Sequence, residues 1–161
     1  MSIPKSIEIE VKGDSLEYEL QGMSNFIAVR KGRVDNCEDF LNTVEKLNIY
    51  SLNDVYNYKD TFILDGWKFS LEYQEAGKEE KFINGQYLPD KIVDLLSEIE
   101  LVIPEAVFFN EIDFDEWLSE LEDVTDDEEV IEEVREEFDR APTWAKKNEV
   151  LDKSIDKIVV K

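Results

Sequence analysis

The chain has 161 residues, of which 42% are hydrophobic and 11% aromatic, and its 40 Asp and Glu outnumber its 18 Lys and Arg, giving a formal net charge of −22. This length suits one domain, or one domain with a helical appendage, and the apolar content is high enough for a hydrophobic core, which excludes a largely disordered chain. A strongly negative protein repels nucleic acid and anionic membranes, so direct binding to either is not expected.

The start of the chain and its single cysteine indicate where the protein works. Met1 to Lys5 lead straight into a strand pattern with no signal peptide, and no apolar run approaches the ~18 residues needed to span a bilayer. Cys37 has no partner for an internal disulfide, as is typical of a reducing compartment. We therefore expect a cytoplasmic protein.

The first hundred residues carry strand signals. Apolar and polar residues alternate over 7–11 and again over 16–20, with the Gly13-Asp14 pair between them, which predicts a hairpin with one apolar face. A third apolar run, 26–29, leads into the basic residues 30–33. We expect these to form a solvated turn, since they are too few for a nucleic-acid-binding patch.

Two helices are predicted in the same part of the chain. The first has Asp35 or Asn36 as its N-cap, and its apolar face is formed by Phe40, Leu41, Val44 and Leu47. The second begins at Pro89, because proline is favoured at the first helical position. Its apolar positions are Ile92, Leu95, Leu96 and Ile99.

The clearest turn signal is the Asp65-Gly66 pair. It separates a strand pattern over 61–64 from an alternating pattern over 67–73, and Asp-Gly in this position is typical of a type I′ hairpin turn. A further strand is expected over 81–83, with Gly85 at its end.

Pro104 marks a change in composition. Residues 105–140 contain seventeen carboxylates and two basic residues, a local charge of −15, which leaves −9 on residues 1–104 and +2 on residues 141–161. Apolar spacing predicts three helices in this part of the chain. Their buried faces are Phe114, Trp117, Leu118 and Leu121; Val130, Ile131, Val134 and Phe138; and Trp144, Leu151, Ile155 and Ile158.

These elements define an α+β fold class. We expect an N-terminal antiparallel sheet of about five strands with two helices, followed by an acidic C-terminal helical segment of about three helices. The corresponding domains are 1–103, the sheet domain, and 104–161, the acidic helical segment packing on it, with one single domain as the alternative.

The residue types present restrict the chemistry. Histidine is absent, which removes the commonest general base and transition-metal ligand, and no glycine-rich phosphate-binding motif occurs. Cys37 is flanked by carboxylates that favour the neutral thiol, so a structural role is expected for it. We predict a non-enzymatic protein with no cofactor.

Carboxylates alone could hold Mg²⁺ or Ca²⁺. Candidates for such ligands are Asp113, Asp115, Glu116, Asp126, Asp127 and Glu129. The calcium-loop pattern is missing, however, because Trp117 and Leu118 occupy positions where that loop needs a ligand and a glycine. No specific metal site is predicted.

The acidic helices have two interpretations. They are either a solvated outer surface or a surface that imitates a polyanion and binds a basic protein. Like charges four residues apart, as in Glu128–Glu132 and Glu133–Glu137, cost each pair about 0.2–0.5 kcal/mol, and a sequence selected for stability alone would interleave lysine. The predicted partner-binding residues are Asp113, Asp115, Glu116, Trp117, Asp126, Asp127, Glu128, Glu129, Glu132, Glu133, Glu136 and Glu137.

The partner we expect is a basic, nucleic-acid-binding effector, such as a nuclease, a toxin or a defence complex. In broad composition the chain resembles bacterial toxin-immunity proteins and phage anti-restriction or anti-CRISPR inhibitors, and no functional residues are carried over from them. The alternative is a scaffold or interaction subunit that binds through an apolar aromatic surface, for which Phe108, Phe109, Phe114 and Trp117 are candidates. These aromatic residues could instead dock the acidic helices on the sheet. The oligomeric state is left open.

Overall fold

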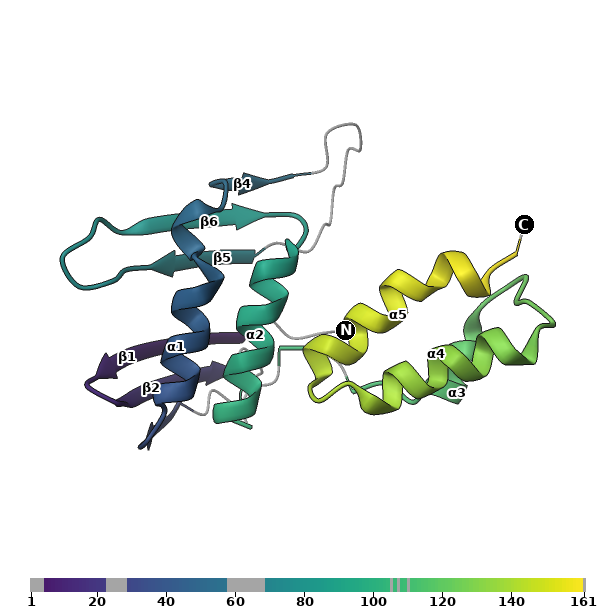
Figure 1. Cartoon of the computed structure of the whole chain (residues 1–161), viewed down its shortest axis with the longest axis horizontal. Coiled ribbons are helices and arrows are strands. Elements are labelled where there is room, and N and C mark those ends of the chain that lie inside the picture. Colours follow the sequence, from purple (N-terminus) through teal and green to yellow (C-terminus); the bar gives the residue numbers. More distant parts are fainter. Residues whose placement is uncertain are drawn as a thin grey trace.

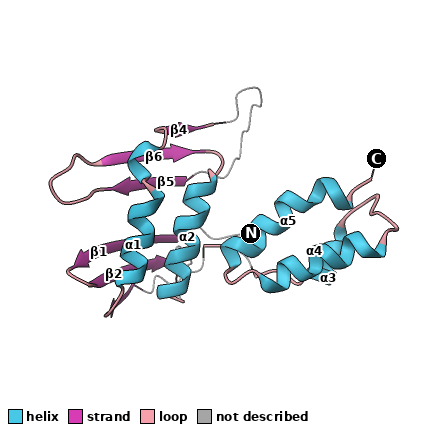
Figure 2. Cartoon of the chain, in the orientation of Figure 1, coloured by secondary structure: helices cyan, strands magenta, loops and turns pink. Residues whose placement is uncertain are grey.

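The computed structural model describes residues 5–22, 29–57, 69–104, 106, 108–109 and 111–160. Over these residues the chain forms five α-helices and two sheets of three strands each (Figures 1 and 2). The α+β class is thus confirmed. The predicted single sheet of about five antiparallel strands matches only roughly, since the described strands divide into two sheets and one pair is parallel.

The first sheet contains β1 (Lys5–Lys12), β2 (Ser15–Gly22) and β3 (Val29–Val34), all antiparallel and in that order. The predicted first hairpin is confirmed, with Gly13 at a φ of +67° in the turn between β1 and β2. Opposite residues in an antiparallel pair share a face, so the apolar residues of the two strands lie together on one side. That side packs against the core and leaves the charged side to solvent.

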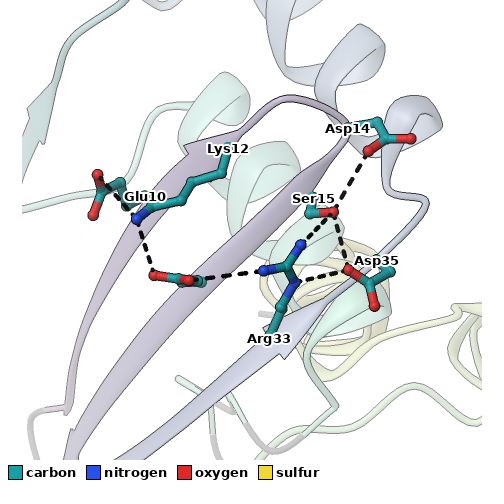
Figure 3. Close-up of polar contacts among 7 residues, drawn as sticks. Glu10, Lys12, Asp14, Ser15, Arg33 and Asp35 are labelled. Atoms are coloured by element: carbon teal, nitrogen blue, oxygen red, sulfur yellow. Dashed lines mark hydrogen bonds and ion pairs between the residues drawn. The ribbon is translucent and has the colours of Figure 1, made fainter.

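The predicted basic turn over residues 30–33 is wrong, because these residues lie within β3. Their cations are opposite carboxylates of β2: Arg33 faces Glu17, and Lys31 faces Glu19. Arg33 also donates through Nε to Asp35 at 2.8 Å, and the Ser15 hydroxyl donates to the same carboxylate at 3.0 Å (Figure 3). Pairing with a distant acidic strand, not local turn propensity, decides the conformation of this run.

The second sheet has the order β4-β6-β5, from β4 (Val55–Tyr56), β6 (Lys81–Gly85) and β5 (Phe69–Tyr73). β6 confirms the strand expected before Gly85, and it pairs antiparallel with β5 but parallel with β4. The Asp65-Gly66 hairpin turn and its strand over 61–64 lie outside the described residues.

Two helices, α1 (Glu38–Leu47) and α2 (Asp90–Val102), pack beside each other and against both sheets (Figure 1). A short 3₁₀ turn, Ile49–Ser51, follows α1. The predicted caps need correction. The N-cap of α1 is Cys37, which forms no side-chain cap bond, and not Asp35 or Asn36; Asn36 has a φ of +56°, which differs from the extended backbone typical of an N-cap. Pro89 is the N-cap of α2 and not its first helical residue.

The remaining helices are α3 (Phe114–Glu120), α4 (Glu128–Arg140) and α5 (Trp144–Ile158). The buried apolar residues fall into two groups. The first core, between the sheets, α1 and α2, is formed by Leu16, Cys37, Phe40, Ile49, Ile83, Ile92, Leu95, Ile99, Ile103 and Ala106. The second core, between α3, α4 and α5, is formed by Phe114, Val134, Phe138, Leu151 and Ile158. Whether the two cores correspond to separate domains stays a prediction.

Polar contacts join the two groups of elements where α2 meets α5. The hydroxyls of Ser97 and Thr143 lie 2.8 Å apart in a buried position, and Glu100 Oε2 accepts the backbone N–H of Trp144 at 2.8 Å. Lys146 forms an ion pair with Asp94 across the same contact. We call this set of contacts the polar seam.

Replacing Gly85 with alanine should destabilise the second sheet. Gly85 is buried, and a Cβ at this position would clash with the backbone carbonyl oxygen of Tyr56 on β4. Overpacking of this kind costs about 1–3 kcal/mol, which urea unfolding of Gly85→Ala would measure. The exposed neighbour Asn84→Ala serves as the control, and an equal loss in both variants would contradict the close approach.

The Asp35 carboxylate should titrate below its usual range. The hydrogen bond from Arg33 lowers its pKa most, followed by the hydrogen bond from Ser15 and the charge of Arg33. Since the pKa is lower in the folded state, this pairing stabilises the fold above the unfolded-state pKa of about 3.9 and is lost as the pH falls through the folded-state value. Carbon NMR titration should give a midpoint below about 3.9 that rises in Arg33→Gln and moves far less in Lys31→Gln.

Candidate acidic binding surface

The acidic residues of α3 are held by the way the helix begins. The Asp113 carboxylate accepts the backbone N–H of Glu116 at 3.1 Å and so caps the helix. Asp115 and Glu116 occupy the first turn, where negative charge interacts favourably with the positive end of the helix dipole. All three side chains are exposed.

The start of α4 uses its acids in the same way. The Asp127 carboxylate accepts the N–H of Glu129 at 3.0 Å, and Thr125 Oγ1 accepts the N–H of Asp127 at 3.2 Å. Glu128 and Glu129 form the acidic first turn. These carboxylates have a local structural role, and that role accounts for their position without any partner.

The later carboxylates of α4 have no such role. Glu133, Glu136 and Glu137 lie beyond the first turn, where the dipole no longer favours negative charge. They are exposed, while Val134 and Phe138 on the opposite side of the helix are buried. Among the described residues, none forms an ion pair with these three carboxylates.

Arg135 joins the acidic parts of the two helices. Its Nη2 lies 2.7 Å from an Asp115 carboxylate oxygen on α3, its Nε lies 3.4 Å from Glu132, and its guanidinium sits 4.7 Å from the centre of the Phe114 ring. The hydrogen bond to Asp115 is the main cause of a raised pKa for Arg135. Sequence spacing does not reveal the contact with Asp115, because the two residues lie twenty positions apart and on different helices.

The contacts of Arg135 bring Asp115 of α3 close to Glu132 of α4, and the other predicted acidic residues lie on the same two helices or at their starts. We call these exposed carboxylates, taken together, the acidic surface. It consists of Asp113, Asp115, Glu116, Asp126, Asp127, Glu128, Glu129, Glu132, Glu133, Glu136 and Glu137, all of which are exposed.

The aromatic candidates lie in a different environment. Phe114 is only 5% exposed, and its ring centre lies 5.6 Å from that of Trp117 and 5.7 Å from that of Phe138. Trp117 is half-buried against the second core, and Phe108 packs against the first. Phe114 and Trp117 therefore pack α3 on α4 and α5 within the second core, and Phe114 is not available as an exposed anchor.

The remaining candidates are Cys37 and the carboxylates considered as metal ligands. Cys37 is 4% exposed, its thiol donates to the Asp14 carbonyl at 3.1 Å, and burial raises its pKa. An open depression of about 380 Å³ is lined by Asp123, Asp126 and Asp127 together with apolar side chains and Thr125. Within the described ranges, however, no three carboxylate or thiol side chains are grouped to hold a metal ion.

Comparison with known proteins gives no relationship: no family model, no curated protein and no solved structure matches this chain. Of the described helices, none has the length and apolar character required to cross a membrane.

Removing Arg135 should loosen the packing of α3 on α4. Arg135→Gln loses the Asp115 and Glu132 pairs and the contact with the Phe114 ring, which we expect to lower the free energy of unfolding by about 1 kcal/mol, with a smaller loss at high salt. Urea unfolding would measure the change. Arg140→Gln is the matched control, since Arg140 Nε donates to the Glu136 carbonyl on its own helix at 3.3 Å and, among the described residues, forms no ion pair with α3. Equal effects of the two variants would contradict this role.

Proposed function

We propose that the protein is a non-enzymatic inhibitor that binds a basic, nucleic-acid-binding effector, such as a nuclease, a toxin or a defence complex, through the acidic surface. We further propose that it does so in the cytoplasm and imitates a nucleic acid. The observation that carries the proposal is the exposure of Glu133, Glu136 and Glu137 on α4, away from the helix start and without an ion-pair partner among the described residues.

The charge spacing on α4 supports imitation of a polyanion. A helix of 13 residues is about 20 Å long, at about 1.5 Å per residue. Seven carboxylates lie within its bounds, or about one per 3 Å, compared with one phosphate per about 1.7 Å of axis in duplex DNA. A surface of this charge density would attract a basic cleft and accelerate association at low salt.

The energetics of the helix also favour a role outside folding. Glu129–Glu133, Glu132–Glu136 and Glu133–Glu137 repel one another at i, i+4, each by about 0.2–0.5 kcal/mol. Arg135 offsets part of this repulsion at Glu132 but lies on the half-buried side, toward α3. A basic partner that covers the outer side would relieve the remainder.

A second candidate function is that of a scaffold or interaction subunit that binds through an apolar surface. One observation favours it: Phe82 and Val55, on β6 and β4, are 54% and 53% exposed. These residues belong to the second sheet, so this contact would leave the acidic surface free and would be insensitive to salt.

Charge reversal on the outer side of α4 tests the leading proposal. The variant Glu132→Lys, Glu133→Lys, Glu136→Lys, Glu137→Lys should lose capture of a basic nucleic-acid-binding protein from host lysate by about 100-fold or more, because close charge pairs supply much of the coupling across such interfaces. For the unmodified protein, capture should weaken steeply with salt, and duplex DNA should compete with it for the captured effector. Mass spectrometry would identify the captured protein.

The control has the same net charge but reverses carboxylates elsewhere. Glu45→Lys, Glu72→Lys, Glu79→Lys, Glu80→Lys changes exposed residues of the sheet-containing part and shifts the formal charge by the same +8. This variant should retain binding. Capture that survives reversal on α4, or that resists both salt and DNA, would defeat the proposal and favour the apolar contact.

A further inference from the structure

The charges of the first sheet are unevenly distributed across its strands. On the charged side, β3 supplies the cations that face β2, with Arg33 opposite Glu17 and Lys31 opposite Glu19. The same two carboxylates face carboxylates of β1 on their other side, since Glu10 is opposite Glu17 and Glu8 is opposite Glu19. Like charges directly opposite each other destabilise a strand pair.

Only Lys12 offsets this repulsion from within the described part of β1. Its Nζ lies 3.5 Å from Glu17 and 4.0 Å from Glu10, close to the turn (Figure 3). Glu8 and Glu10 are both exposed. On the charged side of the sheet, β1 and β2 thus present carboxylates and β3 presents cations. A further strand beside β1 would therefore be favoured if it carried cations.

Among the described residues, no strand pairs with the backbone of β1 on the side away from β2. β1 is an edge strand, and beyond its ladder with β2 no backbone hydrogen bond joins Ser6–Lys12 to any other described residue. In an antiparallel pair, alternate residues direct their N–H and C=O groups away from the partner strand. An edge of this length is a template for an added strand.

The apolar side of β1 is incomplete at the same edge. Val11 is 51% exposed, whereas Leu16, directly opposite it on β2, is 0% exposed. A strand added beside β1 would place an apolar side chain next to Val11 and cover it.

We propose that the edge of β1 binds an extended segment of a partner protein in which lysine or arginine alternates with apolar residues, and that this segment joins the first sheet as a fourth strand. Its cations would face Glu8 and Glu10, its apolar residues would lie beside Ile9 and Val11, and its backbone would complete the open ladder. This surface is separate from the acidic surface, since β1 belongs to the sheet-containing part of the molecule and α4 to the other (Figure 1). Failure of the inhibitor proposal would therefore leave binding at β1 unaffected, and the reverse also holds.

A second copy of the chain fits this edge less well. Antiparallel pairing of two β1 strands with Glu8 opposite Lys12 places Glu10 against Glu10, and each chain carries a formal charge of −22. Charge complementarity thus favours a basic segment over self-association.

The experiment uses the full chain, labelled with ¹⁵N, and a synthetic octapeptide of alternating lysine and valine. The peptide should slow hydrogen exchange at alternate amides of β1 by about ten-fold or more, which only an added ladder of hydrogen bonds would produce. A peptide of the same sequence with N-methylated valines keeps the charge and removes the ladder donors, so it should bind about ten-fold more weakly or worse.

The variant Glu8→Lys, Glu10→Lys should lose peptide binding and retain its fold, because the new lysines face Glu19 and Glu17. Glu8→Gln, Glu10→Gln is the milder second variant, and Glu132→Lys, Glu136→Lys on α4 is the control that should retain binding at β1. Equal binding of the N-methylated peptide, or exchange protection on α4 in place of β1, would overturn the proposal. Protection of β1 that rises with protein concentration and needs no peptide would also overturn it, since the edge would then serve self-association.

Discussion

The arrangement of the whole molecule depends on the polar seam between α2 and α5, which lies between two separate hydrophobic cores. The carboxylate of Glu100 on α2 accepts the N–H of Trp144 at the N-terminal end of α5, and the hydroxyls of Ser97 and Thr143 form a buried contact. Thr143 also caps α5 by accepting the N–H of Lys146, and Lys146 in turn pairs with Asp94. Hydrogen bonds are directional, unlike apolar burial, so this seam determines the orientation in which α4 is presented. The acidic surface is thus held in place by contacts made on the far side of the second core.

Several of the few basic residues form ion pairs that join different strands or helices. Arg33 joins Ser15, Glu17 and Asp35 at the end of the first sheet, Arg135 joins α3 to α4, and Lys146 joins α5 to α2. With 18 basic residues against 40 acidic ones, the surplus of negative charge has to remain where cations are not supplied. In the described structure two such places are prominent, the outer side of α4 and the β1 edge. They differ in kind, because one presents side chains alone and the other also presents an open backbone.

Local patterns in the sequence predicted the elements whose neighbours are close in the chain. The first hairpin and α4 follow from alternation and helical spacing, since a two-residue turn joins the two strands of the hairpin and the buried face of α4 lies within a single helix. The errors have a common cause in contacts between distant segments. The basic run over 30–33 is a strand because β2 offers two glutamates opposite it, and β4 pairs parallel with a strand almost thirty residues later. The contact of Arg135 with Asp115 was missed for the same reason, because spacing within α4 relates Arg135 only to Glu132 and Asp139.

The structure separates the carboxylates that stabilise the helix starts from those that do not, which the composition alone does not. Asp113 and Asp127 are N-caps, and the carboxylates of the first turns of α3 and α4 interact with the helix dipoles, so about half of the acidic surface would be expected in any stable pair of helices. Glu133, Glu136 and Glu137 are different, because neither a cap, a dipole nor a described cation stabilises them where they are. Replacing Glu133 with lysine would improve the isolated helix by the i, i+4 rule, because glutamate lies four residues away on both sides, at Glu129 and Glu137. Stability of the helix does not explain why these three carboxylates lie together on one exposed side, and this is the observation on which the proposed partner depends.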